Sequence, residues 1–215
     1  MTADAAAWDA LRLSLWVAVW ATLLAIPLAL WVAWLLARRD FWGKALLNAA
    51  VHLPLVLPPV VTGYLLLMAF GRNAPLGRAL DAIGLQLAFH WSGAVLAAII
   101  MGFPLMVRAM RLAIEAVDPK LEDAAATLGA PRAAVFARVT LPLILPGVLA
   151  GTVMGFAKAM GEFGATITFV ANIPGQTQTL PSAIWAALQI PGGEGQAVAM
   201  VLMSSAIAVS AVLLS

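Results

Sequence analysis

The chain alternates long apolar stretches with short polar segments. Five stretches approach or exceed the roughly 20 apolar residues that a helix needs to cross a bilayer, and they cover residues 11–37, 45–70, 91–107, 143–170 and 197–215. No segment shows the alternation of a membrane-spanning strand. We therefore expect an all-α membrane protein, one transmembrane domain over residues 1–215 with about five transmembrane helices. The last stretch has no polar tail, so we expect the natural chain to continue beyond Ser215.

Proline interrupts several of these stretches. Pro27 and Pro104 each lie inside one stretch and predict a kink. Pro54, Pro58 and Pro59 fall close together in the second stretch, where no regular helix can continue. Broken backbone is tolerated in a membrane only where protein or a water-filled cavity satisfies the freed carbonyl groups. We expect this second stretch to lie inside the helix bundle, near a transport pathway.

Composition supports the membrane assignment and removes several classes of function. The chain is 63% hydrophobic and only 10% charged, whereas an average soluble domain has about 25% charged residues. It has no cysteine, so it cannot form a disulfide or a cysteine-ligated metal site. The formal net charge is only +2 and the basic residues gather in loops, which is typical of topology signals rather than of a surface that binds nucleic acid.

The basic residues also set the expected orientation. With five spans, eight of them fall on one side of the membrane: Arg38, Arg39, Lys44, Arg108, Arg111, Lys120, Arg132 and Arg138. Three fall on the other side, namely Arg12, Arg72 and Arg78. The positive-inside rule then places the loop of residues 115–147 in the cytoplasm, and the N-terminus and the loop of residues 171–195 on the outer face.

Residues 115–147 form a polar segment between the third and fourth apolar stretches. Asp118-Pro119 is typical of a helix start, and acidic residues follow in the first turn, where they favour the helix dipole. Gly129 predicts the end of this helix in a left-handed turn. A second short helix should follow before the chain returns to the membrane.

Two interpretations fit this pair of short helices. The first helix presents small residues, Ala124 to Ala126, and such a thin flank can insert into a groove on a soluble partner. A hairpin that lies at the membrane surface on its own spans would show the same pattern. The local signals alone leave both interpretations open.

A longer motif in this segment resembles the EAA loop of ABC-importer permeases. The matching residues are Asp123-Ala124-Ala125, then Gly129 after three residues, then Val139-Thr140-Leu141-Pro142 after nine more. Many family members carry Glu where this chain has Asp123, and Ile where it has Val139. Glu122 stands one place earlier, so the resemblance leaves open which acid engages the partner.

The EAA resemblance implies the type I ABC-importer permease fold with a cytoplasmic coupling helix. It also implies two sets of residues. The ATPase-coupling set is Glu122, Asp123, Ala124, Ala125, Leu128, Gly129 and Ala130, and the set that returns the chain to the membrane is Val139, Leu141 and Pro142.

Further motifs resemble the molybdate branch of these permeases. They are Gly161-Glu162-Phe163-Gly164-Ala165-Thr166, Asn172-Ile173-Pro174-Gly175, Thr179-Leu180-Pro181, Phe103-Pro104-Leu105-Met106-Val107-Arg108 and the proline-rich run that begins at His52. The branch implies import of molybdate or tungstate by alternating access. Sulfate and thiosulfate permeases share parts of the pattern and are the alternative.

The same resemblance implies the partners. We expect a homodimer in the cytoplasmic membrane, two ABC ATPase subunits and an extracytoplasmic molybdate-binding protein, with no nucleic acid. The sequence contains no G-x-x-x-x-G-K-[ST] phosphate loop, so ATP and magnesium should be bound by the ATPase. We expect this chain to carry no catalytic residue, no metal and no cofactor.

The anion pathway is less sharply marked. Its candidate residues, for lining or gating, are Lys158, Glu162, Thr166, Thr168 and Asn172. Lys158 and Glu162 are four apart, so on a helix they would share a face and neutralise each other. They could act in transport or extend to the membrane surface, and the other polar side chains could equally serve packing.

A row of small residues marks the fourth stretch. Gly147, Gly151 and Gly155 are four residues apart, a spacing that lets two helices approach closely. The partner helix could belong to the same subunit or to a second copy.

Two other classes of protein compete with a permease. A membrane enzyme is disfavoured because the chain has only His52 and His90, no cysteine, and acids that cluster in one loop. An ion channel or ion-coupled carrier would work without an ATPase, and transport measurements would separate it from a permease.

Overall fold

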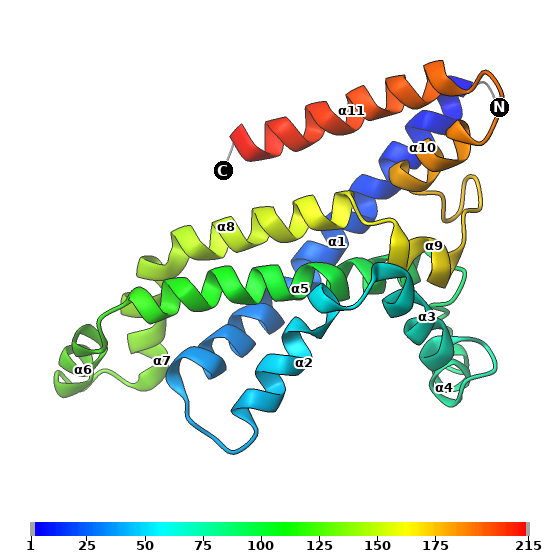
Figure 1. Cartoon of the computed structure of the whole chain (residues 1–215). Coiled ribbons are helices and arrows are strands. Elements are labelled where there is room, and N and C mark those ends of the chain that lie inside the picture. Colours follow the sequence, from blue (N-terminus) through cyan, green and yellow to red (C-terminus); the bar gives the residue numbers. More distant parts are fainter. Residues whose placement is uncertain (1–2, 214–215) are drawn as a thin grey trace.

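Three long helices form the centre of the protein. The computed structural model describes residues 3–213, and all regular structure in that range is helical. α1 (Ala3–Arg38) runs the length of the molecule, α5 (Trp91–Ala116) packs along it, and α8 (Leu141–Met160) packs on α5 (Figure 1). The predicted kink sites Pro27 and Pro104 lie inside continuous helices.

Small residues bring α1 close to its neighbours. Ala21, Ala25, Ala29 and Ala33 recur every four residues, and each is almost completely buried. Because the i, i+4 spacing keeps them on one face, α1 presents a narrow smooth stripe to α5. The buried side chains around this stripe include Met106, Met110 and Ile114 of α5 and Ile144 of α8.

The glycine row of α8 packs inside the subunit, against α5. A Cβ added at Gly147 would collide with Cβ of Ala113, and one at Gly155 would lie 2.6 Å from Sδ of Met106. Gly151 lies against the carbonyl oxygen of Met106, where an added Cβ would sit at 3.2 Å. Of the two interpretations of this row, the structure selects packing within one chain.

The proline-rich second stretch is broken, as predicted. α2 (Lys44–Val56) and α3 (Pro59–Phe70) are bent by 115° around the Leu57-Pro58 connection. Nδ1 of His52 lies 2.8 Å from the carbonyl oxygen of Asn48, which places this histidine in a local hydrogen bond. At the start of α2, Nζ of Lys44 lies 2.8 Å from Oδ1 of Asp40 and lowers the pKa of that exposed carboxyl group.

The segment of residues 115–147 differs from its prediction in two respects. α5 continues to Ala116, so Glu115 belongs to its last turn and pairs with Arg111 at 2.7 Å. The second short helix is not separate. α7 (Arg132–Val135), the π-helical turn η1 (Phe136–Thr140) and α8 form one continuous helix from Arg132 to Met160. The helix thus continues through η1 into α8, which packs on α5.

The fourth apolar stretch, in contrast, is not one helix. α8 ends at Met160 and α9 (Gly164–Val170) begins after a break at residues 161–163. The loop after α9 leads to α10 (Leu180–Leu188), and α11 (Glu194–Leu213) follows. The short helix α4 (Pro75–Asp81) follows α3.

The number of spans can be compared only over the described residues. Three helices there are long and apolar enough to cross a membrane, and the bent pair α2 and α3 makes four if it counts as one span. The expected fifth span falls on α11, whose part Glu194–Ile207 is a shorter apolar helix. The last two residues of that expected span, 214 and 215, lie outside the described residues.

Candidate functional site

The short helix α6 (Pro119–Thr127) lies at one end of the molecule, next to α7 (Figure 1). Oδ1 of Asp118 accepts a hydrogen bond from the backbone N–H of Lys120 at 2.9 Å, so Asp118 is the predicted N-cap. Gly129 has φ +85°, which confirms the predicted left-handed turn. α6 is therefore a capped helix with a defined end.

The two adjacent acids of α6 have different surroundings. Oε1 of Glu122 accepts a hydrogen bond from Oγ1 of Thr140 at 2.8 Å and contacts Nη2 of Arg38 at 3.3 Å. The same guanidinium nitrogen donates to the carbonyl oxygen of Val117 at 3.0 Å. Glu122 thus ties α6 to the end of α1 and to η1, whereas Asp123 is exposed. The structure separates an anchoring acid from a surface acid.

A π-helical turn brings Thr140 to Glu122. Thr140 is 1% exposed and is the last residue of η1. π-helical turns are rare and occur frequently at functional sites. Of the other predicted return residues, Val139 lies in η1 and is partly buried, while Leu141 and Pro142 begin α8.

The outer surface of α6 is apolar next to its acid. Leu128 is 89% exposed and Leu121 is 49% exposed. Ala124 is exposed, and Ala125 and Ala130 are partly exposed. A surface helix that holds leucines in solvent can lay an apolar face into a groove on a partner.

Lys158 and Glu162 form an ion pair at the other end of α8. Nζ of Lys158 lies 2.8 Å from Oε2 of Glu162, and the side chains are 29% and 2% exposed. They do not share one helix as predicted, because Glu162 lies in the break after Met160. There its Oε1 accepts a hydrogen bond from the backbone N–H of Ala165 at 3.0 Å. Glu162 therefore holds the first turn of α9 as well as the lysine.

The remaining pathway candidates lie on or just after α9. Thr166 is buried, and Oγ1 of Thr168 donates to the carbonyl oxygen of Gly164 at 2.9 Å. Nδ2 of Asn172 lies 3.5 Å from the carbonyl oxygen of Ser182, while its Oδ1 is buried without a hydrogen-bond partner. Lys158 and Glu162 therefore lie at the helix break, Thr166 and Thr168 on α9, and Asn172 beyond the end of α9.

Sequence reasoning missed a close contact between two broken helices. A Cβ added at Gly164, the first residue of α9, would lie 2.7 Å from Cβ of Pro59, the first residue of α3. One added at Gly63 would lie 2.5 Å from the carbonyl oxygen of Ala165. Gly63 and Gly164 were a usable signal, because close backbone approach requires glycine.

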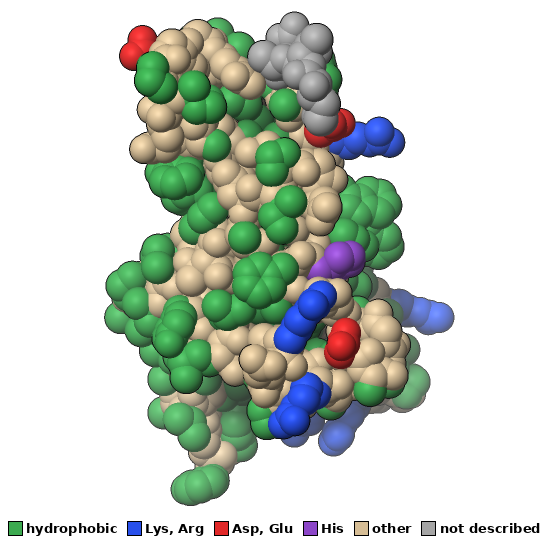
Figure 2. Space-filling model, turned by 90° about the vertical axis from the view of Figure 1, so that its right-hand side faces the viewer, with side chains coloured by type: hydrophobic (Ala, Val, Ile, Leu, Met, Phe, Trp, Pro, Cys, Tyr) green, Lys and Arg blue, Asp and Glu red, His purple; other side chains and the backbone are tan. Residues whose placement is uncertain are grey.

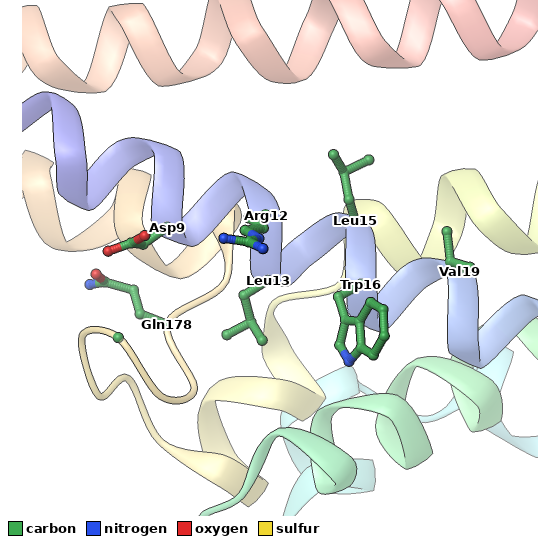
Figure 3. A pocket seen from close by; sticks show the side chains of 8 residues that line it. Asp9, Arg12, Leu13, Leu15, Trp16, Val19 and Gln178 are labelled. Carbon is green, nitrogen blue, oxygen red and sulfur yellow. The ribbon is translucent and has the colours of Figure 1, made fainter.

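A cavity of about 660 Å³ at the opposite end from α6 was also missed. Figure 3 shows Asp9, Arg12 and Trp16 of α1 around it, with Gln178 approaching from the loop before α10. Figure 2 views this end of the molecule, where charged side chains form small groups among hydrophobic ones. Asp9 and Arg12, one helical turn apart near the start of a long apolar helix, were the signal in the sequence.

A family model decides the class of the protein. The family described as "Binding-protein-dependent transport system inner membrane component" matches residues 25–215. The chain belongs to this family. It is thus a multi-pass membrane protein of a transport system.

Curated relatives refine this membership. The chain is 56% identical over 209 residues to the molybdenum transport system permease protein ModB of Escherichia coli K12, covering 97% of this chain and 91% of that protein. It is 55% identical to ModB of Haemophilus influenzae, with 96% and 91% covered. The sulfate transport system permease protein CysW of Synechococcus elongatus is 39% identical, over 80% of this chain and 60% of that protein.

Solved structures confirm the fold of this inner membrane component. A bacterial ABC transporter that imports alginate matches with a TM-score of 0.75 at 19% identity, covering 96% of this chain and 76% of that one. An amino acid ABC transporter matches with a TM-score of 0.69 at 16% identity, covering 98% and 91%. The predicted ABC-importer permease fold is therefore confirmed.

Proposed function

We propose that this chain is the membrane-spanning permease subunit of an ATP-driven molybdate importer, and that it works by alternating access. The observation that carries the proposal is that residues of α6 and its C-cap have two different kinds of surroundings. Glu122 fastens the helix to α1 and η1, while Asp123 and Leu128 remain on the surface. A surface helix that is rigidly joined to two long helices is suited to pass on the movement of a soluble motor.

The proposed partners are inferred from the exposed surface of α6 and from the similarity to the permeases described above. Two ABC ATPase subunits dock on α6 from the cytoplasm, and ATP and magnesium are bound there. A binding protein delivers the anion to the outer face, and two copies of this chain form the pathway. The positive-inside rule supports this orientation, because the α6 side carries the larger number of basic residues.

The choice of anion is supported by relative similarity. The ModB proteins of Escherichia coli and Haemophilus influenzae are at least 55% identical to this chain over more than nine tenths of its length. The sulfate permease reaches 39% over a smaller part. Molybdate, with tungstate as its close chemical analogue, is therefore the substrate that we propose ahead of sulfate and thiosulfate.

The proposed pathway lies at the break between α8 and α9. Lys158 and Glu162 hold this break together and Thr166, Thr168 and Asn172 follow it. Movement of α8 would directly displace the ion pair at this break, because Lys158 belongs to the last turn of α8. We assign the ion pair a positioning role and α9 the role of a gate element.

Reconstitution tests the proposal. The permease, its ATPase and its binding protein are placed in liposomes, and uptake of molybdate, tungstate and sulfate is measured with and without ATP. ATP-dependent molybdate uptake that sulfate fails to inhibit is the expected result. Full uptake without the ATPase would instead identify a carrier or channel, and preferential sulfate uptake would identify the sulfate branch.

A further inference from the structure

A second cavity, of about 640 Å³, lies between the last third of α1 and the unit formed by α6 and η1. One part of its lining is apolar and includes Pro27, Trp31 and Phe136. The other part is basic and includes Arg38, Arg39 and Arg132. The cavity therefore has an apolar wall and a cationic end.

The cationic end is only partly neutralised. Two acids, Glu122 and Asp123, also line the cavity, and Glu122 is already paired with Arg38. Arg39 and Arg132 are exposed and form no ion pair within residues 3–213. Arg38 leaves its buried Nε without a hydrogen-bond partner. The arginines at this end therefore have N–H groups available to bind an anionic ligand.

The apolar wall has the depth of one membrane leaflet. Pro27 and Arg38 are eleven residues apart on one continuous helix, so they are separated by about 16 Å along its axis. Half of the hydrocarbon core of a bilayer measures roughly 15 Å. Trp31 is 57% exposed at this wall, and the guanidinium of Arg39 lies 5.3 Å from the ring of Trp34. Tryptophan beside arginine is typical of the membrane interface.

These dimensions match a phospholipid better than a small anion. A free phosphate could use the arginines but would leave the apolar wall in contact with water. A lipid places its phosphate at the arginines and its acyl chain against that wall at the same time. Guanidinium groups suit this ligand because they bind phosphate through paired hydrogen bonds.

We propose that this cavity binds one anionic phospholipid of the cytoplasmic leaflet. Arg39 and Arg132 hold its phosphate, and Trp31 and Phe136 contact its acyl chain. Because Arg39 continues from α1 while Arg132 and Phe136 belong to α7 and η1, the lipid bridges α1 to the unit that carries α6. The proposal rests on the cytoplasmic orientation given under Proposed function.

The binding test uses purified permease–ATPase complex in nanodiscs of phosphatidylcholine with increasing phosphatidylglycerol. Native mass spectrometry counts the phosphatidylglycerol molecules that remain bound after detergent extraction. We expect one retained lipid per permease. The double variant R39Q/R132Q should hold it roughly 25-fold less tightly, at about a fivefold loss for each basic residue. The matched control R72Q/R78Q removes two arginines from the opposite side and should retain the lipid.

Three results would overturn the proposal. Equal retention by R39Q/R132Q and the unmodified protein would show that the cavity is not the lipid site. Equal competition by inorganic phosphate would show a simple anion site. Retention by the permease alone but not by the permease–ATPase complex would show that the cavity belongs to the ATPase interface. Since lipid retention is measured without transport, a failure of molybdate uptake alone would count against the proposed function and not against this site.

Discussion

Oγ1 of Thr140 donates a hydrogen bond to Oε1 of Glu122 at 2.8 Å, although the two residues are 18 positions apart. This contact joins a short surface helix to a long helix of the membrane domain. Arg38 reaches the same carboxylate oxygen from α1. Glu122 is therefore the point where three elements meet, and the predictions about coupling start from it.

Replacing Glu122 by alanine should loosen α6 from the membrane domain. Hydrogen bonds to charged groups contribute about 1.5–3 kcal/mol, so the melting temperature should fall and ATP-driven uptake should be strongly reduced. The neighbouring variant Asp123→Ala is the matched control, because Asp123 is exposed. It should weaken ATPase binding at unchanged melting temperature. Equal effects of the two variants on thermal melting would contradict the separation of their roles.

Replacing Gly129 by valine should uncouple ATP hydrolysis from transport. Nothing lies within 4 Å of an added Cβ there, so the cost comes from the positive φ alone and should be about 1–2 kcal/mol. Gly84→Val carries the same strain at φ +78° and also meets open space, but it lies far from α6. ATPase activity and uptake should both stay normal in that control. Normal coupling in Gly129→Val would rule out a need for this turn.

Replacing Leu128 by serine should reduce co-purification of the ATPase. Leu128 is 89% exposed, so its removal should leave the melting temperature of the isolated permease unchanged. Ile83→Ser is the control. Ile83 is 76% exposed, but it follows α4, which lies at the opposite end of the molecule from α6 (Figure 1). An unchanged amount of bound ATPase in a pull-down would show that Leu128 is not part of the docking surface.

Replacing Lys158 by methionine should destabilise the break between α8 and α9. The carboxylate of Glu162 is 2% exposed and would lose its cation, at a cost of about 3 kcal/mol. The double variant Lys158→Met with Glu162→Gln should recover much of this loss, because the glutamine is uncharged and still accepts from Ala165. Thermal melting of the four proteins forms a double-mutant cycle. Additive losses would show that the two side chains do not act as a pair.

Replacing Gly147 by valine should force α5 and α8 apart. The new side chain would meet Ala113, and overpacking of this kind costs about 1–3 kcal/mol. Gly195→Val meets nothing within 4 Å and serves as the control. Melting temperature and oligomeric state are measured together. A stable chain that has lost its dimer would place the glycine row between subunits instead.

Local signals in the sequence predicted the elements that have strong end markers. Asp118-Pro119 and Gly129 fixed both ends of α6, and the three prolines of the second stretch fixed the break between α2 and α3. The family and the apolar spans followed from motif spacing and hydropathy. These features depend on residues close together in the chain, which is why they could be read without a structure.

Features that depend on distant contacts could not be predicted in this way. In the continuous helix from Arg132 to Met160 the α8 part packs on α5, and no residue marks the π-helical turn before it. The different surroundings of Glu122 and Asp123 depend on Arg38 and Thr140, which lie far away in sequence. Both cavities likewise lie between segments that only the fold brings together.

The unbroken helix of 29 residues from Arg132 to Met160 has a mechanical consequence. At 1.5 Å per residue it is about 43 Å long, so a tilt of about 5° at the end beside α6 would shift its far end by about 4 Å. That shift is larger than the 2.8 Å between Lys158 and Glu162. A small angular change beside α6 would thus be amplified, by length alone, into a displacement large enough to remake every polar contact around Glu162.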